Sequence, residues 1–223
     1  VTAGLATVGV RVPAHEIARQ FIAACGVPIA APSANLSTKI SPTSASHVYE
    51  DMNGRIPLII DGGECGVGIE STVLDITGEV PVILRPGAIT AQMIADVLGE
   101  VKTHDGKILA AAPAPGMKYK HYAPVCDCVV ADCVQSALIE YAARRNKGGN
   151  PVILCRGNNK DKYGTAAVVN LGDSDIEICA KIYGAMHIAE KEYDCIICED
   201  FGNEGIAASV MNRVNKSAGG KRV

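Results

Sequence analysis

Three prolines lie within the twelve residues 113–124, near the middle of the chain. Proline lacks a backbone N–H and has a fixed φ, so a segment of this kind stays extended and does not continue a helix or a central strand. We therefore expect a linker here, between residues 1–112 and residues 125–223. A chain of 223 residues is long enough for each part to build its own core.

The part that follows this linker alternates short apolar runs with helical patterns. Strands are expected over residues 126–130, 152–155, 166–170 and 195–198. Helices are indicated by apolar spacing at residues 134, 137, 138 and 141, by a capping box of Ser174 with Glu177, and by the pattern of residues 205–215. Strands that alternate with helices predict a small, doubly wound α/β domain.

The first part also mixes strands with helices. Strands are expected over residues 7–12, 28–31 and 57–61, with a hairpin over residues 71–76 and 80–84. Helices are expected from Pro13 until Gly26, from a cap at Ser41 until Gly54, and from a cap at Thr90 through Leu98. Residues 99–112 are weakly patterned. This combination predicts a mixed sheet with helices.

Composition excludes several classes of protein. The net charge is −3, with −2 in residues 1–124 and −1 in residues 125–223, so bulk charge gives no sign of nucleic-acid binding. No apolar run approaches the roughly 20 residues of a membrane helix. Nine cysteines, an odd number without scaffold spacing, are typical of a reducing cytoplasm. Cys195 and Cys198 fall on opposite faces of an expected strand, which argues against a metal site built from cysteine.

Polar side chains crowd the loop that follows the second expected strand. This loop contains Ser33, Asn35, Ser41 and Thr43. Such a cluster is commonly turn and cap chemistry, but loops after buried strands also bind ligands. Short polar side chains suit phosphate and ribose oxygens, and both interpretations stay open on the residues alone.

Two arginines and a glycine-rich loop also allow both a structural and a ligand-binding interpretation. Arg11 and Arg85 lie at a strand position and a strand end, where an arginine is either solvated or clamps an anion. The loop over residues 62–68 is neither a P-loop nor a dinucleotide fingerprint. It is either a flexible connection or a backbone approach to an anion, with Ser71 as a donor. The linker's tyrosines and lysines could stack on a base or form a strap between the domains.

Seven ordered motifs and a tail resemble one known family, the two-domain YrdC-like threonylcarbamoyl-AMP synthases. The motifs are Thr-Val-Gly-Val-Arg-Val-Pro-Ala-His (7–15), Ala-Pro-Ser-Ala-Asn (31–35), Ser-Pro-Thr (41–43), Asp-Gly-Gly (61–63), Gly-Ile-Glu-Ser-Thr-Val (68–73), Leu-Arg-Pro-Gly (84–87) and Pro-Gly-Met-Lys-Tyr-Lys-His-Tyr-Ala-Pro (115–124). The tail comprises residues 203–207 and 211–213. The resemblance implies a YrdC-like mixed twisted sheet followed by a smaller Rossmann-like α/β domain.

The resemblance also implies an activity. Enzymes of this family are nucleotidyltransferases that join L-threonine, bicarbonate and ATP, with Mg²⁺, into threonylcarbamoyl-AMP and pyrophosphate. The product serves the threonylcarbamoyladenosine modification of tRNA in the cytoplasm, so tRNA or a tRNA-modifying complex is an expected partner. By motif, ATP contacts are implied for Thr7, Asn35, Thr43, Arg85, Tyr119, His121 and Tyr122. A threonine or carbamate pocket is implied for Arg11, Ser33 and Ser71, with the linker as a lid.

This sequence departs from the family pattern in two places. The family's Lys-x-Arg motif and part of its threonine pocket are absent, so we expect this chain alone to be inactive. Ser37-Thr38 replaces the Ser-Gly that usually follows the Ser-Ala-Asn motif. A non-catalytic RNA- or nucleotide-binding module is the alternative function. Carbamoyl transfer in hydrogenase maturation is a further one, which the linker and second domain oppose.

Overall fold

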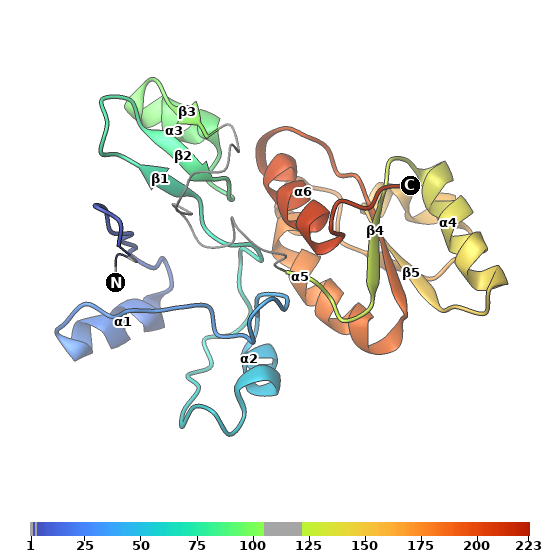
Figure 1. The fold of residues 1–223 in the computed structure, drawn as a ribbon, viewed down its shortest axis with the longest axis horizontal. Coiled ribbons are helices and arrows are strands. Elements are labelled where there is room, and N and C mark those ends of the chain that lie inside the picture. Colours follow the sequence, from blue (N-terminus) through green and yellow to red (C-terminus); the bar gives the residue numbers. More distant parts are fainter. Residues whose placement is uncertain (1, 3, 105–121) are drawn as a thin grey trace.

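A computed structural model describes residues 2, 4–104 and 122–223, and it contains two parts that lie side by side (Figure 1). Residues 122–223 form a compact α/β domain. Residues 4–104 form a more open arrangement of three helices and one small sheet against the side of that domain. Among the described helices, none is long and apolar enough to cross a membrane.

The C-terminal domain is built on a parallel sheet in the order β4-β7-β5-β6. Its strands are Asp127–Ala131 (β4), Pro151–Cys155 (β5), Val168–Asn170 (β6) and Cys195–Glu199 (β7). Its helices are Val134–Asn146 (α4), the 3-10 helix Gly157–Tyr163 (η1), Asp175–Glu192 (α5) and Gly205–Ser217 (α6). The strands and the three α-helices expected from the sequence are confirmed, whereas η1 had no recognised signal.

Helices cover both faces of this sheet and bury a core on each. One core packs α5 and α6 against the sheet, and the other packs α4 and η1 against it (Figure 1). Cys198 belongs to the first core and Cys195 to the second, so the prediction that these two thiols point to opposite faces is confirmed. Residues at the C-terminus pair with β4, where the Val223 N–H donates to the Val130 carbonyl at 2.8 Å.

The first part contains a three-stranded sheet in the order β1-β2-β3. Val73–Asp75 (β1) and Val82–Arg85 (β2) form the expected antiparallel hairpin, and Lys102–Thr103 (β3) adds a parallel strand that the weak pattern there did not predict. Asp75 accepts hydrogen bonds from the N–H and hydroxyl of Thr77, which stabilises the turn. The expected mixed pairing is therefore present in this small sheet.

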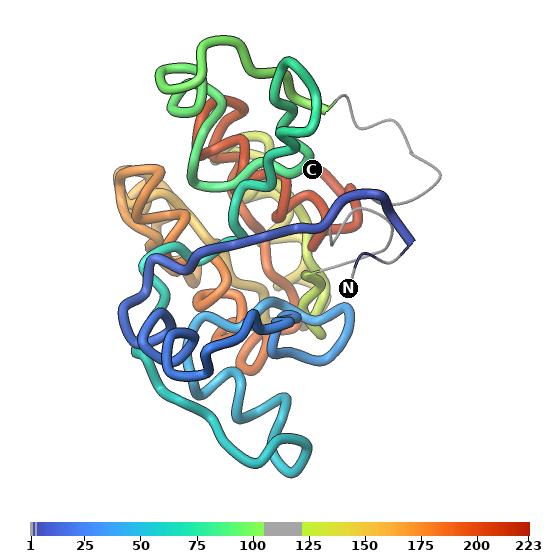
Figure 2. The backbone as a smooth tube through the Cα atoms, turned by 90° about the vertical axis from the view of Figure 1, so that its left-hand side faces the viewer, coloured from blue at the N-terminus to red at the C-terminus, as the bar shows by residue number. Residues whose placement is uncertain are grey.

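Three strands predicted in the first part are absent. Residues 7–12, 28–31 and 57–61 belong to no described strand, and Figure 2 shows the dark-blue N-terminal segment as an extended stretch that crosses the view. Val10 is 85% exposed and Val12 is 82% exposed. Alternating apolar residues favour a strand, but a strand forms only where a neighbour accepts its backbone hydrogen bonds. No described segment pairs with these residues, so the prediction was wrong for the chain as it stands.

The helices of the first part are Glu16–Cys25 (α1), Ala45–Met52 (α2) and Ala91–Leu98 (α3). Gly26 ends α1 with φ 65°, and Thr90 caps α3 by accepting from the Met93 N–H, both as expected. Two starts were predicted too early. Helix α1 begins three residues after Pro13, and Ser44 rather than Ser41 caps α2.

Candidate functional site

The hairpin brings two of the sequence-predicted site residues together. Antiparallel pairing places Val73 opposite Arg85, so the residues just before β1 lie next to the end of β2. The Arg85 side chain donates from Nε and Nη2 to the Ser71 carbonyl, at 3.2 and 3.0 Å. An arginine predicted to contact ATP and a serine predicted to line the threonine pocket are therefore neighbours.

Several charged and aromatic side chains surround Arg85. Burial lowers its pKa, the charge of Arg213 lowers it further, and Glu70 raises it. Tyr122 stacks on Tyr183 with ring centroids 5.7 Å apart. Burial raises the pKa of Tyr122, Glu70 raises it too, and the two arginines oppose this shift. The structure thus places one of the three predicted linker residues in the surroundings of Arg85.

The loop that follows residue 31 carries two further predicted nucleotide contacts, Asn35 and Thr43. Asn35 donates from Nδ2 to the carbonyls of Leu36 at 3.0 Å and Lys39 at 3.2 Å. Its Oδ1 is buried without a hydrogen-bond partner among the described residues. An unsatisfied buried acceptor is costly, and a ligand that carries an N–H or O–H would satisfy it. The amide of Asn35 thus both stabilises the turn and offers an acceptor.

Thr43 immediately precedes Ser44, the N-cap of α2, and is 9% exposed. Its N–H donates to His47 Nδ1 at 3.3 Å, and its carbonyl accepts from the Cys65 N–H at 2.9 Å. These contacts join the 41–43 loop to the glycine-rich loop over residues 62–68. Two loops that were separate candidates in the sequence are therefore in direct contact.

The positions of the remaining predicted site residues are less well defined by contacts with other residues. Thr7, Arg11 and Ser33 are exposed and therefore open to a ligand. Tyr119 and His121 lie outside the described residues, and so does most of the predicted linker. In the ranges 4–104 and 122–223, no group of three or more His, Cys, Asp or Glu side chains is arranged to hold a metal ion.

Sequence reasoning missed three residues at the centre of this region, Glu70, Tyr183 and Arg213. Glu70 accepts from Arg213 Nε at 3.0 Å, from Ser41 Oγ at 2.6 Å and from the Tyr183 hydroxyl at 3.5 Å. Glu70 and Arg213 both lie within segments that resemble the family. However, they are 143 residues apart, and no local spacing relates them.

Fold and contacts together define a two-domain α/β protein whose candidate site lies where loops of the first part meet helices α5 and α6. Residues 1–87 match the family described as "Telomere recombination" (Sua5_yciO_yrdC). Residues 89–219 match the family described as "Threonylcarbamoyl-AMP synthase, C-terminal domain". The chain belongs to the threonylcarbamoyl-AMP synthase family, as its motifs indicated.

Individual relatives agree with this assignment. The chain is 43% identical to a threonylcarbamoyl-AMP synthase of Pyrococcus abyssi and 40% identical to one of Bacillus subtilis. These alignments cover 98% and 99% of this chain and 66% of each relative, so the chain spans just under two thirds of their length. The crystal structure of P. abyssi Sua5 complexed with L-threonine superposes with a TM-score of 0.90 at 40% identity, over 100% of this chain and 67% of that one. This superposition confirms the expected fold class.

Proposed function

We propose that this chain is part of an L-threonylcarbamoyladenylate synthase, a nucleotidyltransferase that makes threonylcarbamoyl-AMP and pyrophosphate from L-threonine, bicarbonate and ATP. The observation that carries the proposal is the match to a structure complexed with L-threonine, at 40% identity over 100% of this chain. Two relatives named threonylcarbamoyl-AMP synthase, at 43% and 40% identity, support the same reaction.

The proposed reaction has two steps. The amine of threonine attacks the carbon of bicarbonate, and a carbamate forms with loss of water. A carbamate oxygen then attacks the α-phosphorus of ATP, a P–O bond forms, and pyrophosphate leaves. The second step needs positive charge and oriented donors at the phosphates rather than a covalent nucleophile. Arg85 supplies a guanidinium for this purpose, and Ser71 lies beside it.

Other residues take supporting roles in this proposal. Asn35 and Thr43 hold the nucleotide, with the unsatisfied Asn35 Oδ1 as an acceptor for a ligand donor. Thr7 completes the nucleotide contacts, and Arg11 and Ser33 complete the threonine pocket. Residues 113–124 close over the site, because a carbamate that is open to water decomposes. Tyr119, His121 and Tyr122 then come close to the nucleotide.

Further parts of the proposal rest on the chemistry of the substrates. Mg²⁺ enters with ATP as part of the substrate and is held mainly by phosphate oxygens and water, as is usual for this ion. The product is passed on for threonylcarbamoyladenosine modification of tRNA. In this proposal the protein acts in the cytoplasm, in contact with tRNA or a tRNA-modifying complex.

The proposal is tested by pyrophosphate release from the complete gene product. We expect release only when both L-threonine and bicarbonate accompany Mg·ATP. Arg85→Lys should lower the rate by about 10²-fold or more, because a lysine cannot form the same fork of donors. Arg145→Lys, on the far side of the C-terminal domain, is the matched control and should leave the rate unchanged.

Two results would contradict the proposal. One is pyrophosphate release that is unchanged in both Arg85→Lys and Asn35→Ala. The other is a salt-dependent affinity for RNA without any nucleotide binding, which would favour the non-catalytic RNA-binding module instead.

A further inference from the structure

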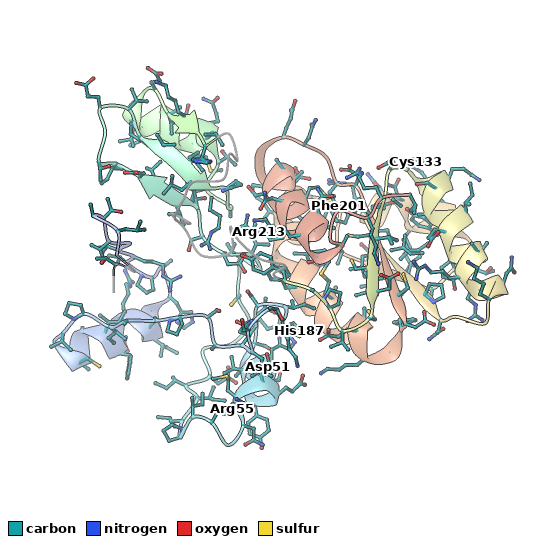
Figure 3. All side chains as sticks on the ribbon, in the orientation of Figure 1. Asp51, Arg55, Cys133, His187, Phe201 and Arg213 are labelled. Atoms are coloured by element: carbon teal, nitrogen blue, oxygen red, sulfur yellow. The ribbon has the colours of Figure 1, made fainter. Side chains whose placement is uncertain are left out.

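Arg213 is a fully buried charge at the junction of the two parts. Its side chain is 0% exposed, and it extends from α6 toward the first part of the chain (Figure 3). A buried guanidinium is tolerated only where its N–H groups find acceptors. Most of the acceptors of the Arg213 N–H groups belong to the first part of the chain. These acceptors identify the segments that Arg213 holds in place.

These acceptors lie next to the predicted site residues. Arg213 donates from Nε to Glu70 Oε2 at 3.0 Å, from Nη2 to the Glu70 carbonyl at 3.2 Å and from Nη1 to the Pro86 carbonyl at 2.6 Å. Glu70 immediately precedes Ser71, and Pro86 immediately follows Arg85. Arg85 itself donates to the Ser71 carbonyl. The contacts therefore form a closed ring that runs from Arg213 to Glu70 and Ser71, on to Arg85 and Pro86, and back to Arg213.

Glu70 extends this ring to a third segment. Its Oε1 accepts from Ser41 Oγ at 2.6 Å, and Ser41 begins the loop that carries Thr43. The Ser41 carbonyl lies 3.2 Å from Nε2 of His187 on α5. Both helices of the C-terminal domain that face the first part therefore hold segments with predicted substrate contacts.

The two segments held by Arg213 are also closely packed against each other. A Cβ atom on Gly87 would lie 2.3 Å from the Thr72 nitrogen and 2.8 Å from the Glu70 carbonyl oxygen. The Gly87 carbonyl accepts from Ser209 Oγ of α6 at 2.8 Å. With the backbones this close, a displacement of one segment is transmitted to the other.

We infer that Arg213 is a positioning residue for the substrate site. Arg213 holds the segments of Ser71 and Arg85 in register, and in this way the C-terminal domain sets the affinity for Mg·ATP and L-threonine. This inference rests on the proposed function. It assigns the C-terminal domain a direct part in substrate binding, although that domain supplies no proposed substrate contact apart from Tyr122 at its N-terminal edge.

The test compares two arginine-to-lysine changes in the complete gene product. Arg213→Lys keeps the positive charge but replaces a planar fork by a single ammonium, which cannot reach both Glu70 and Pro86 in the same geometry. Arg144→Lys is the matched control. Arg144 lies on α4, across the sheet, and also bridges two acidic side chains, Asp127 at 2.8 Å and Glu140 at 2.6 Å.

Two readouts are compared. Calorimetry should give dissociation constants for Mg·ATP and for L-threonine that both rise by about tenfold or more in Arg213→Lys and do not change in Arg144→Lys, since small misplacements of binding groups have large effects. Hydrogen exchange should be faster over residues 68–73 and 84–88 in Arg213→Lys only. If Arg213→Lys does not fold, Glu70→Gln makes the same comparison, because it removes the carboxylate and keeps the shape.

The outcomes separate this inference from the proposed function. A folded Arg213→Lys protein with unchanged dissociation constants and unchanged exchange overturns the inference. If the unmodified protein binds neither ligand, the proposed function fails, and hydrogen exchange alone decides whether Arg213 holds the two segments. A loss of thermal stability in both lysine variants, without a selective change in binding, also overturns the inference.

Discussion

At the scale of single residues, the surroundings of each cysteine determine its chemistry. Cys133 is exposed at the N-cap of α4, where the Ser136 N–H and hydroxyl lower the pKa of its thiol. Cys128 and Cys195 lie in the buried sheet, where burial raises the pKa of each thiol to about 12. Because the thiolate is the reactive species, cysteines of the same chain differ widely in their expected reactivity.

This difference predicts the order of alkylation. With iodoacetamide at pH 8, Cys133 should be modified while the protein is folded, and Cys195 only after unfolding in urea. Mass spectrometry of the peptides measures both. Modification of Cys195 at the rate of Cys133 in the folded protein would contradict the burial of β7.

At the scale of elements, helix α5 joins the two parts. Its N-terminus has the capping box predicted from Ser174 and Glu177, and its second turn contacts the glycine-rich loop. The Gly68 N–H donates to the Cys179 carbonyl at 3.1 Å, and a Cβ on Gly68 would lie 2.3 Å from the Ala180 carbonyl oxygen. This glycine is therefore required for close contact between backbones, rather than for flexibility.

Gly68→Ala should consequently destabilise the protein by about 1–3 kcal/mol, because the loop must withdraw from α5 and lose its hydrogen bond. Gly66→Ala is a matched control in the same loop, since a Cβ there meets no atom within 4 Å. Urea unfolding of the two variants gives the comparison. Equal stability of both would show that the loop does not touch α5.

At the scale of the whole molecule, two stacked histidines join α2 to α5. The rings of His47 and His187 lie 3.9 Å apart at 20°, and in Figure 3 His187 lies on the side of α5 that faces α2. Burial lowers the pKa of His47 below its ordinary value of 6.5, and the charges of His187 and Lys191 lower it further. The carboxylates of Glu50 and Glu64 oppose this shift without reversing it.

The sign of the pH dependence follows from this lowered pKa. Below pH 6.5 the unfolded chain protonates His47 before the folded protein does, so the free energy of unfolding decreases as the pH falls toward the pKa of the folded state. Well above pH 6.5 His47 is neutral in both states and contributes no pH dependence. Urea unfolding between pH 5 and 7.5 should show this decrease, and His47→Gln should reduce it.

Prediction from sequence succeeded where the signal was local. The capping box of α5, the Thr90 cap of α3 and the glycine that ends α1 depend on contacts within one turn of a helix. The strand predictions at residues 7–12 and 28–31 failed because a strand depends on a partner that its own pattern does not specify. The family motifs assigned Arg85 to ATP and Ser71 to the threonine pocket, but the contact between the two residues comes from the hairpin register.

By itself, the sequence determined the succession of elements in the C-terminal domain and the family to which the chain belongs. Each of these depends on residues that are close together or on ordered motifs. Only the tertiary structure decided that Arg213 of α6 lies against Glu70 and Pro86, and that α5 requires a glycine at position 68. The physical reason is that the fold decides which atoms come near a buried charge and which backbones come into close contact. Those atoms lie more than a hundred residues away along the chain.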